Sequence, residues 1–299
     1  MEKHYYKIYG LTLASDYEFP QFVSIEKNDK EPDIIIEHGD ISEEIKLAAD
    51  KGQICDYGKK ELWFNNQTGY FWIRENKISF LEKEDVSVDD AAQFLPGMCL
   101  AILLWFHENI MLHGACIRID DKTIVIAGNS GSGKSTLMTE LIKKGAKLIA
   151  DDVTCIRQSD GRYLSYPAFP AQKLCLDQIE NNNISTDGLR QVRYDLNKYE
   201  IPRNEEFFDE PSEVNTLFRV EVGNCEELEM SKIDGAEKIK VVTDSIFIEW
   251  LFNQEFRVEP EDLLRCLGFA SGISIHRIIR NKEKNTLDSI LEYILNNID

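Results

Sequence analysis

The chain has 299 residues, of which 43% are hydrophobic and 29% are charged, as in ordinary globular proteins. Its 53 acidic residues outnumber 34 basic ones, and the formal net charge of −19 argues against nucleic acid as a partner. The longest apolar run, Met98–Phe106, is too short to cross a bilayer, and the N-terminus lacks the apolar core of a signal sequence. Seven scattered cysteines without a CxxC pair are typical of reduced thiols. We therefore expect a cytoplasmic protein that has no nucleic acid and no membrane as partner.

The first part of the chain, residues 1–88, carries short apolar or alternating stretches that predict β-strands. These stretches are Tyr5–Tyr9, Asp33–Glu37, Glu61–Asn65, Tyr70–Arg74 and Ile78–Leu81. Glu75–Lys77 has the composition of a hairpin turn between the last two. Two stretches with helical patterning follow, Asp89–Phe94 and Met98–Glu108. We expect a small β-rich N-terminal domain over residues 1–88 and a second domain over residues 89–299.

Within the second domain, a predicted hairpin follows these two helical stretches. Ala115–Ile119 and Thr123–Ala127 are apolar and are separated by a turn at Asp120 and Asp121. A two-residue turn fixes the register, in which Ile117 faces Ile124 and Ala115 faces Ile126. The same register brings His113 opposite Gly128, beside the segment that follows the second strand.

That segment, Gly128–Ser135, reads GNSGSGKS and matches the phosphate-binding pattern GxxxxGK[ST]. A strand precedes it and the helical stretch STLMTELIKK follows, which is the context that the motif requires. Backbone N–H groups and the helix N-terminus would bind phosphate oxygens, Lys134 would reach the β and γ phosphates, and Ser135 would hold Mg²⁺. The residues expected to bind the nucleotide are Gly128, Asn129, Ser130, Gly131, Ser132, Gly133, Lys134, Ser135 and Thr136. The sequence therefore predicts binding of a nucleoside triphosphate.

A pair of aspartates follows the next predicted strand. Lys147–Ala150 is apolar, is expected to run parallel to the loop strand, and ends at Asp151 and Asp152. Adjacent side chains on a strand point to opposite sides, so one carboxylate could bind Mg²⁺ while the other faces a different group. A carboxylate that accepts a hydroxyl proton would suit phosphoryl transfer. The pair could equally be a turn or a helix cap.

The remaining chain is less informative. The polar stretch Gln178–Asn215 could be a lid, a substrate loop or a surface excursion. Cations that could neutralise a transferring phosphoryl group, or could simply be surface charges, are Lys173, Arg190, Arg193, Lys198 and Arg203. Towards the C-terminus we predict helices over Asp244–Phe256, Glu261–Phe269 and Leu287–Ile298, and a strand over Ile273–Ile279 that carries a packed His276.

The order of His113-Gly114, the phosphate loop and Lys147–Asp152 resembles the catalytic domain of HPr kinase/phosphorylase. The resemblance implies an α/β fold with a P-loop kinase core like that of ATP-dependent phosphoenolpyruvate carboxykinase, and a serine hydroxyl as acceptor. It implies that Asp152 accepts the proton, that His113 belongs to the active site and that Ser135 binds Mg²⁺, for which Asp151 is our second candidate ligand. It also allows a homo-oligomer.

Other segments resemble HPr kinase-related proteins found with peptide-modification genes, which include kinases of the C-terminal serine of lasso peptide precursors. These segments are Tyr5–Leu13, and Tyr166–Pro170 followed by Gln172–Leu174. Two features depart from HPr kinase itself: Thr136 stands where HPr kinases have Glu, and no counterpart of their Glu-Ile-Arg-Gly-Leu-Gly segment is found.

We therefore expect an ATP- and Mg-dependent phosphotransferase with Lys134, His113 and Asp152 as catalytic residues, acting on a serine of a peptide or small protein. Three alternatives stay open: a kinase of a small-molecule hydroxyl, HPr kinase/phosphorylase proper, and a non-catalytic nucleotide-sensing regulator. No NKxD guanine signature is present, which argues against a GTPase.

Overall fold

The structure is a computed structural model that describes residues 3–58, 60–193, 197–247 and 259–298. It is a mixed α/β protein whose chain separates into two compact units, Met1–Glu108 and Asn109–Asp299. The division falls later than the boundary at residue 88 expected from the sequence. The reason is that the helices following residue 88 pack against strands of the N-terminal sheet.

The N-terminal unit contains an eight-stranded sheet in the order β3-β1-β2-β4-β8-β7-β6-β5. In chain order its strands are β1 (His4–Ile8), β2 (Leu11–Ser15), β3 (Val23–Ser24), β4 (Ile34–His38), β5 (Cys55–Gly58), β6 (Glu61–Asn65), β7 (Gly69–Arg74) and β8 (Lys77–Glu82). All five predicted strands are present. Three strands, β2, β3 and β5, were not among the predicted ones. β2 reads LTLAS, β3 has only two residues, and β5 reads CDYG, with little apolar content.

Four helical segments accompany this sheet: α1 (Glu43–Asp50), α2 (Val88–Ala92), the π-helical turn η1 (Leu95–Cys99) and α3 (Leu100–Phe106). The last three form the continuous stretch Val88–Phe106, which is long and apolar enough to cross a membrane by length and composition. However, 67% of its apolar window is buried within the structure, and α3 packs on β7 and β8. Such burial is that of a core helix.

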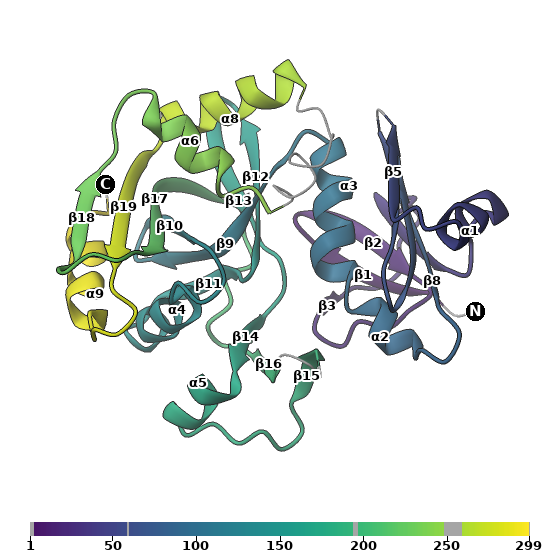
Figure 1. Ribbon diagram of the computed structural model, residues 1–299, viewed down its shortest axis with the longest axis horizontal. Coiled ribbons are helices and arrows are strands. Elements are labelled where there is room, and N and C mark those ends of the chain that lie inside the picture. Colours follow the sequence, from purple (N-terminus) through teal and green to yellow (C-terminus); the bar gives the residue numbers. More distant parts are fainter. Residues whose placement is uncertain (1–2, 59, 194–196, 248–258, 299) are drawn as a thin grey trace. The chain divides into compact units, whose positions relative to one another are not determined.

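The second unit is built on another eight-stranded sheet. Its strands are β9 (Ile110–Ile119), β10 (Lys122–Ala127), β11 (Lys147–Ala150), β12 (Val153–Ser159), β13 (Arg162–Tyr166), β17 (Ser212–Val222), β18 (Glu229–Lys232) and β19 (Ser274–Arg280). β17 bonds to β13 through its first residues and to β10 along its middle, so β10, β9, β12, β13 and β17 close a ring. β10, β17 and β19 are parallel, and their carboxyl ends meet at one edge (Figure 1).

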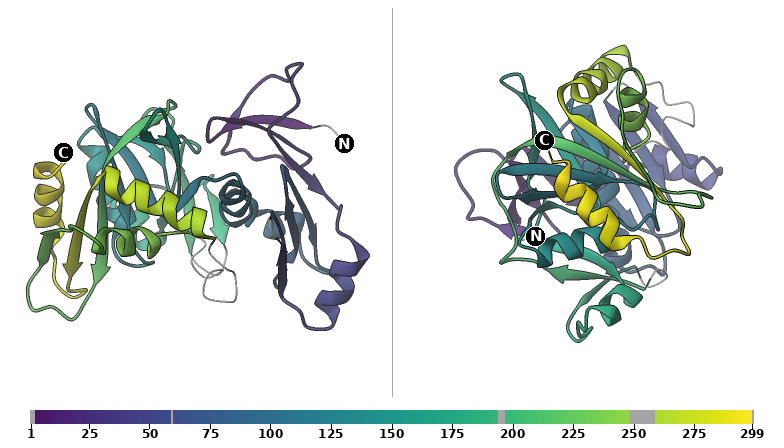
Figure 2. Two further views of the ribbon diagram at one scale, coloured as in Figure 1. Left: turned by 90° about the horizontal axis from the view of Figure 1, so that it is seen from above. Right: turned by 90° about the vertical axis from the view of Figure 1, so that its left-hand side faces the viewer.

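The helices of this unit lie on two sides of the sheet, as Figure 1 shows. They are α4 (Lys134–Lys143), α6 (Glu237–Thr243), α8 (Pro260–Gly272) and α9 (Leu287–Asn296), while α5 (Leu176–Asn181) packs on a smaller sheet described below. α6 packs on α8, which contacts β13 and β19, whereas α4 and α9 pack on each other. The second view in Figure 2 shows α9 in front of the strands, close to the C-terminus.

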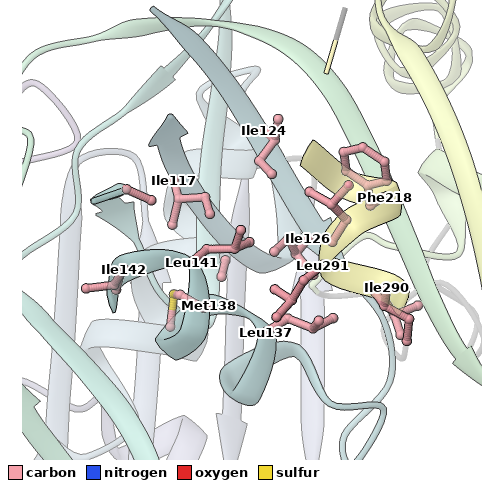
Figure 3. Packing of buried hydrophobic residues seen from close by; sticks show 14 of the residues in the cluster. Ile117, Ile124, Ile126, Leu137, Met138, Leu141, Ile142, Phe218, Ile290 and Leu291 are labelled. Atoms are coloured by element: carbon pink, nitrogen blue, oxygen red, sulfur yellow. The ribbon is translucent and has the colours of Figure 1, made fainter. Parts of the chain in front are cut away.

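The core beneath the phosphate loop is an apolar cluster between the sheet and helices α4 and α9 (Figure 3). Ile117, Ile124 and Ile126 point from the hairpin towards Leu137 and Leu141 of α4. Each fully buried side chain of this kind contributes about 1.5–3 kcal/mol. The cluster therefore anchors the strand before the loop and the helix after it, and so fixes the loop between them.

A three-stranded sheet and α5 project from the second unit below β11 (Figure 1). Its strands are β14 (Ala171–Cys175), β15 (Arg190–Arg193) and β16 (Lys198–Pro202), in the order β14-β16-β15. The stretch Gln178–Asn215, for which a lid or loop was one prediction, thus contributes two strands of this sheet and the beginning of β17.

The hairpin prediction is confirmed, since Ile117 pairs with Ile124 and Ala115 with Ile126. The strand Lys147–Ala150 is also confirmed and has the direction of β10, but it bonds to β9, which lies between them. The helix predicted to begin at Asp244 is wrong over residues 244–247, which form a turn after α6 and a bridge from Ile246 to Leu112. The rest of that prediction, residues 248–256, lies outside the described residues.

Candidate active site

The phosphate loop connects β10 to α4. Gly128, Gly131 and Gly133 have φ values of 154°, 79° and 106°, a region that favours glycine. A Cβ on Gly128 would lie 2.2 Å from the carbonyl oxygen of Val220 on β17, so this glycine also permits a close backbone approach. α4 begins at Lys134 without a side-chain cap, which leaves its first N–H groups directed into the loop. This combination is a site for an anion.

Arg280 supports the loop from β19, and the loop encloses the hydroxyl of Ser132. Arg280, the last residue of β19, donates from Nε to the carbonyl oxygen of Ser132 over 2.8 Å. The hydroxyl of Ser132 is buried and has no hydrogen-bond partner among the described residues. A Cβ on Gly128 would lie 2.7 Å from that hydroxyl, so the hydroxyl lies within the curve of the loop. A buried hydroxyl without a partner is costly unless a ligand supplies one.

Lys134 lies along the loop. Its Nζ donates to the carbonyl oxygens of Gly128 and Asn129, over 2.6 and 3.1 Å. Burial lowers the pKa of Lys134 to about 8, against the opposing effect of Asp152 and Asp151. The side chain of Asn129 is fixed by Arg219, whose Nη2 lies 3.0 Å from Oδ1.

The aspartate pair follows β11 directly, and the two carboxylates have different surroundings. Oδ2 of Asp151 accepts the backbone N–H of Lys173 over 2.6 Å, while Oδ2 of Asp152 lies 2.9 Å from the ammonium of the same lysine. Burial and the charge of Asp152 raise the pKa of Asp151. Burial would also raise the pKa of Asp152, but Lys173, Lys198 and His113 lower it well below its usual value. Asp152 is therefore ionised at neutral pH.

The backbone of Asp152 is unusual. Its φ is 68°, a conformation that costs energy for a residue with a side chain. The carbonyl oxygen of Asp152 accepts the N–H of Gly114 on β9 over 3.2 Å. The turn directs the carboxylate towards His113 and Lys173 at the end of the strand, and strain of this kind occurs at functional sites.

His113 completes the cluster from β9. Its Nε2 lies 3.7 Å from Oδ1 of Asp152, and its ring makes an edge contact with Phe247 at 5.6 Å between centroids. Burial, followed by the charge of Lys134, lowers the pKa of His113 to about 4, although Asp152 opposes the shift. His113 is therefore neutral at pH 7, and its ring can donate one hydrogen bond and accept another.

The structure thus brings His113, Lys134, Asp151 and Asp152 together at the carboxyl ends of the strands. Two further loop residues contact the projecting three-stranded sheet and its helix: the carbonyl oxygen of Ser135 accepts from Gln172 over 3.3 Å, and the hydroxyl of Thr136 accepts from Gln178 over 2.6 Å. The hydroxyl of Ser135 makes no hydrogen bond within the described part of the chain. It is a possible oxygen ligand for a metal ion, as is Asp151.

Of the basic residues that the sequence suggested, Lys173 proves central. Arg203 instead supports the sheet, with Nη2 2.7 Å from Oε1 of Gln172, and Arg190 lies 3.9 Å from Glu200. The side chain of Arg193 lies outside the described residues. Sequence reasoning missed Arg219 and Arg280, although their positions towards the carboxyl ends of strands that run parallel to the loop strand could have indicated them.

Comparison with known proteins places this site within a recognised family segment. The family model described as HPr Serine kinase C-terminal domain matches residues 105–176. An HPr kinase/phosphorylase from Clostridium botulinum (strain Eklund 17B / Type B) is 50% identical over 119 residues, which are 40% of this chain and 36% of the relative. One from Lactobacillus gasseri is 32% identical over 94 residues, 30% of each chain. The chain spans about a third of the length of these curated relatives.

A solved structure, the Hpr(Ser) kinase/phosphatase from Coxiella burnetii, aligns with a TM-score of 0.33 and 17% identity, over 62% of this chain and 94% of that one. The family match covers the phosphate loop, His113 and both aspartates. The resemblance seen in the sequence is confirmed on this segment: residues 105–176 are similar to the C-terminal domain of HPr Serine kinase.

Proposed function

We propose that this protein is an ATP- and Mg²⁺-dependent kinase that phosphorylates a serine hydroxyl on a peptide or small protein. The observation that carries the proposal is the position of Asp152. It is an ionised carboxylate between His113 and Lys173, at the carboxyl ends of the strands and beside the phosphate loop. A protein that only binds nucleotide needs the loop but has no use for a strained carboxylate beside it.

The loop residues fit a triphosphate. One anion could accept hydrogen bonds from three sources. These are the backbone of the loop, which turns at Gly131 and Gly133, the uncapped N–H groups at the start of α4, and the buried hydroxyl of Ser132. Lys134 would exchange its two carbonyl acceptors for phosphate oxygens. Charge-assisted hydrogen bonds of this kind contribute about 1.5–3 kcal/mol each.

The residues also fit Mg²⁺. No group of three or more His, Cys, Asp or Glu side chains that could hold a metal exists among the described residues. That is compatible with Mg²⁺ in phosphoryl transfer, which takes one or two protein ligands and completes its shell with phosphate and water oxygens. Ser135 and Asp151 would supply those ligands, and the raised pKa of Asp151 would fall when a cation binds beside it. The metal ion would neutralise charge on the phosphates.

The chemical step follows from these positions. The acceptor hydroxyl oxygen forms a bond to the γ phosphorus, and its proton passes to a carboxylate oxygen of Asp152. The bond between the γ phosphorus and the bridging oxygen breaks, and its electron pair leaves with ADP. Neutral His113 orients Asp152 or a phosphate oxygen, and Lys173 keeps the carboxylate ionised until the proton arrives.

The choice of a peptide or small protein as acceptor is supported by the matching family model and relatives, which are named for HPr and serine, and by the sequence segments that resemble peptide-modifying kinases. In the structure Tyr5–Leu13 contains most of β1 and most of β2 of the N-terminal unit. Thr136, at the position where HPr kinases have Glu, binds Gln178 and offers no carboxylate to the site. This difference favours an acceptor other than HPr. Seven free thiols are consistent with a cytoplasmic location.

The test is transfer from γ-labelled ATP in the presence of Mg²⁺ to three acceptors: a peptide that ends in serine, HPr, and free serine. Mass spectrometry of the peptide should show one added phosphate on the serine. Labelling of free serine alone would exclude the peptide acceptor, and labelling of HPr alone would indicate HPr kinase proper. Nucleotide binding without transfer to any acceptor would exclude the kinase proposal.

A further inference from the structure

The projecting three-stranded sheet has one apolar and one charged face. Leu174 and Ile201 are buried and pack with Ile179 of α5, which covers the apolar face. Side chains alternate along a strand, so the neighbours of Leu174 and Ile201 point to the other face. These neighbours include Lys173 and Glu200, which are directly paired between β14 and β16.

The charged face is a row that leads to the aspartate pair. Lys173, Glu200 and Arg190 are cross-strand partners in turn, and Glu200 is only 9% exposed. Arg190 lies 3.9 Å from Oε2 of Glu200, while the ammonium of Lys173 lies 2.9 Å from Asp152. This face of the sheet is therefore directed at the active site. The charges of Lys173, Glu200 and Arg190 are each close to an opposite charge.

Lys198 is on the same face but is not paired with an opposite charge among the described residues. It lies two residues before Glu200 on β16 and pairs with Cys175 of β14, so it is a diagonal neighbour of Lys173. Its ammonium forms no hydrogen bond or ion pair within the described parts of the chain. Yet its charge acts on His113, Lys134, Asp151 and Asp152, which are the groups of the active site.

We propose that Lys198 contacts the phosphoryl group during transfer and neutralises the charge on its oxygens. This inference rests on the proposed kinase function and adds a catalytic residue to it. In phosphoryl transfer the protein acts by positioning and electrostatics, and a cation in a water-poor site is effective because it needs no reorganisation. Lys134 is bound to carbonyl oxygens of the loop and Lys173 to Asp152, whereas Lys198 is the one of the three that has no anionic or carbonyl partner among the residues that the structure describes.

The projecting sheet would then serve to position Lys198 relative to the phosphate loop. The sheet carries the cation on one face, while Gln172 and Gln178 tie its first strand and its helix to the phosphate loop through Ser135 and Thr136. The position of Lys198 is thus fixed relative to the bound nucleotide by hydrogen bonds at the base of the sheet.

The experiment compares Lys198→Met and Lys198→Arg with the wild type and with Lys7→Met, a substitution of an exposed lysine on β1 in the other unit. Two quantities are measured in the full-length protein: kcat for transfer to the acceptor peptide, and the affinity for Mg-ADP with and without tetrafluoroaluminate, which mimics the phosphoryl group in transfer. Circular dichroism melting confirms folding, and Lys198→Gln replaces Lys198→Met if that variant does not fold.

We expect Lys198→Met to lose about 10²- to 10³-fold in kcat while its Mg-ADP affinity stays within about threefold of wild type. Tetrafluoroaluminate should tighten ADP binding in the wild type and in Lys7→Met but not in Lys198→Met, and Lys198→Arg should recover part of both. A Lys198→Met variant with wild-type kcat and wild-type tightening would overturn the inference and leave the kinase proposal standing. A wild type that transfers to no acceptor would remove the kinase proposal, whereas tightening that depends on Lys198 would still place it at the phosphoryl group.

Discussion

Lys173 and Asp152 form an ion pair with 2.9 Å between Nζ and Oδ2, and the pair sits at the entrance to β12. Because the backbone N–H of the same lysine binds Asp151, one residue of the projecting sheet fixes both carboxylates. The pairing explains how two adjacent, partly buried aspartates can coexist: one is neutralised by an ammonium and the other retains an oxygen for a metal ion.

The first prediction concerns Asp152→Asn. The amide keeps the shape of the side chain but cannot accept a proton, so we expect transfer to fall by at least about 10²-fold. Affinity for Mg-ATP should stay close to wild type, because Asp152 does not belong to the phosphate loop. Nucleotide titration and single-turnover transfer measure the two effects separately, and equal transfer by the variant would remove Asp152 from the mechanism.

Lys173→Met tests whether Lys173 sets the pKa of Asp152. Lys173 lowers the pKa of Asp152, so its removal raises that pKa. Transfer requires the ionised carboxylate, and we therefore expect the acid limb of the pH–kcat profile to move to higher pH in this variant. Lys173→Arg keeps the charge and should keep the limb in place. A profile that only drops in height, with an unmoved acid limb, would show that Lys173 acts through folding alone.

Gly128→Ala should destabilise the protein through the sheet. The added methyl would meet the carbonyl oxygen of Val220 at 2.2 Å, which requires β10 and β17 to separate, and φ is 154° at this position. We expect a loss of at least about 2 kcal/mol in the free energy of unfolding, measured by urea denaturation.

The matched control is Gly131→Ala, where φ is 79° but nothing lies within 4 Å of the added methyl. Its backbone cost alone is about 1–2 kcal/mol. Equal stability of Gly128→Ala and wild type would mean that the loop can shift away from β17 without cost.

Local patterns predicted what depends on neighbours in the sequence. The register of the β9–β10 hairpin followed from its two-residue turn, and the same register placed His113 at the loop. The aspartate pair was placed correctly because it directly follows an apolar strand. In each case the chain's own periodicity determines which side of the sheet a residue faces.

What the sequence could not supply are contacts made across long separations. From the sequence, Lys173 could have been a surface charge. A charged residue that alternates with an apolar one, as Lys173 does with Leu174, occurs both in exposed hairpins and in strands that line an active site. Arg219 and Arg280 lie on strands whose order in the sheet is not encoded locally. The pairing of β11 with β9 instead of β10 likewise depends on sheet order.

The last prediction concerns the pH dependence of nucleotide binding. Burial lowers the pKa of Lys134 to about 8 in the free protein, so its ammonium is present at pH 7 and is lost as the pH rises through 8. A bound triphosphate favours the charged form and raises this pKa, so binding takes up a proton in that range. Affinity for ATP should therefore fall above pH 8, by up to about tenfold for each pH unit.

Lys134→Met should bind ATP about 10- to 100-fold more weakly at pH 7, since it lacks the charge-assisted hydrogen bonds. Its affinity should also be nearly independent of pH between 7 and 9, and isothermal titration at several pH values measures both. If the wild type and the variant weakened in parallel across this range, the titrating group would lie elsewhere and Lys134 would not be the ligand of the phosphates.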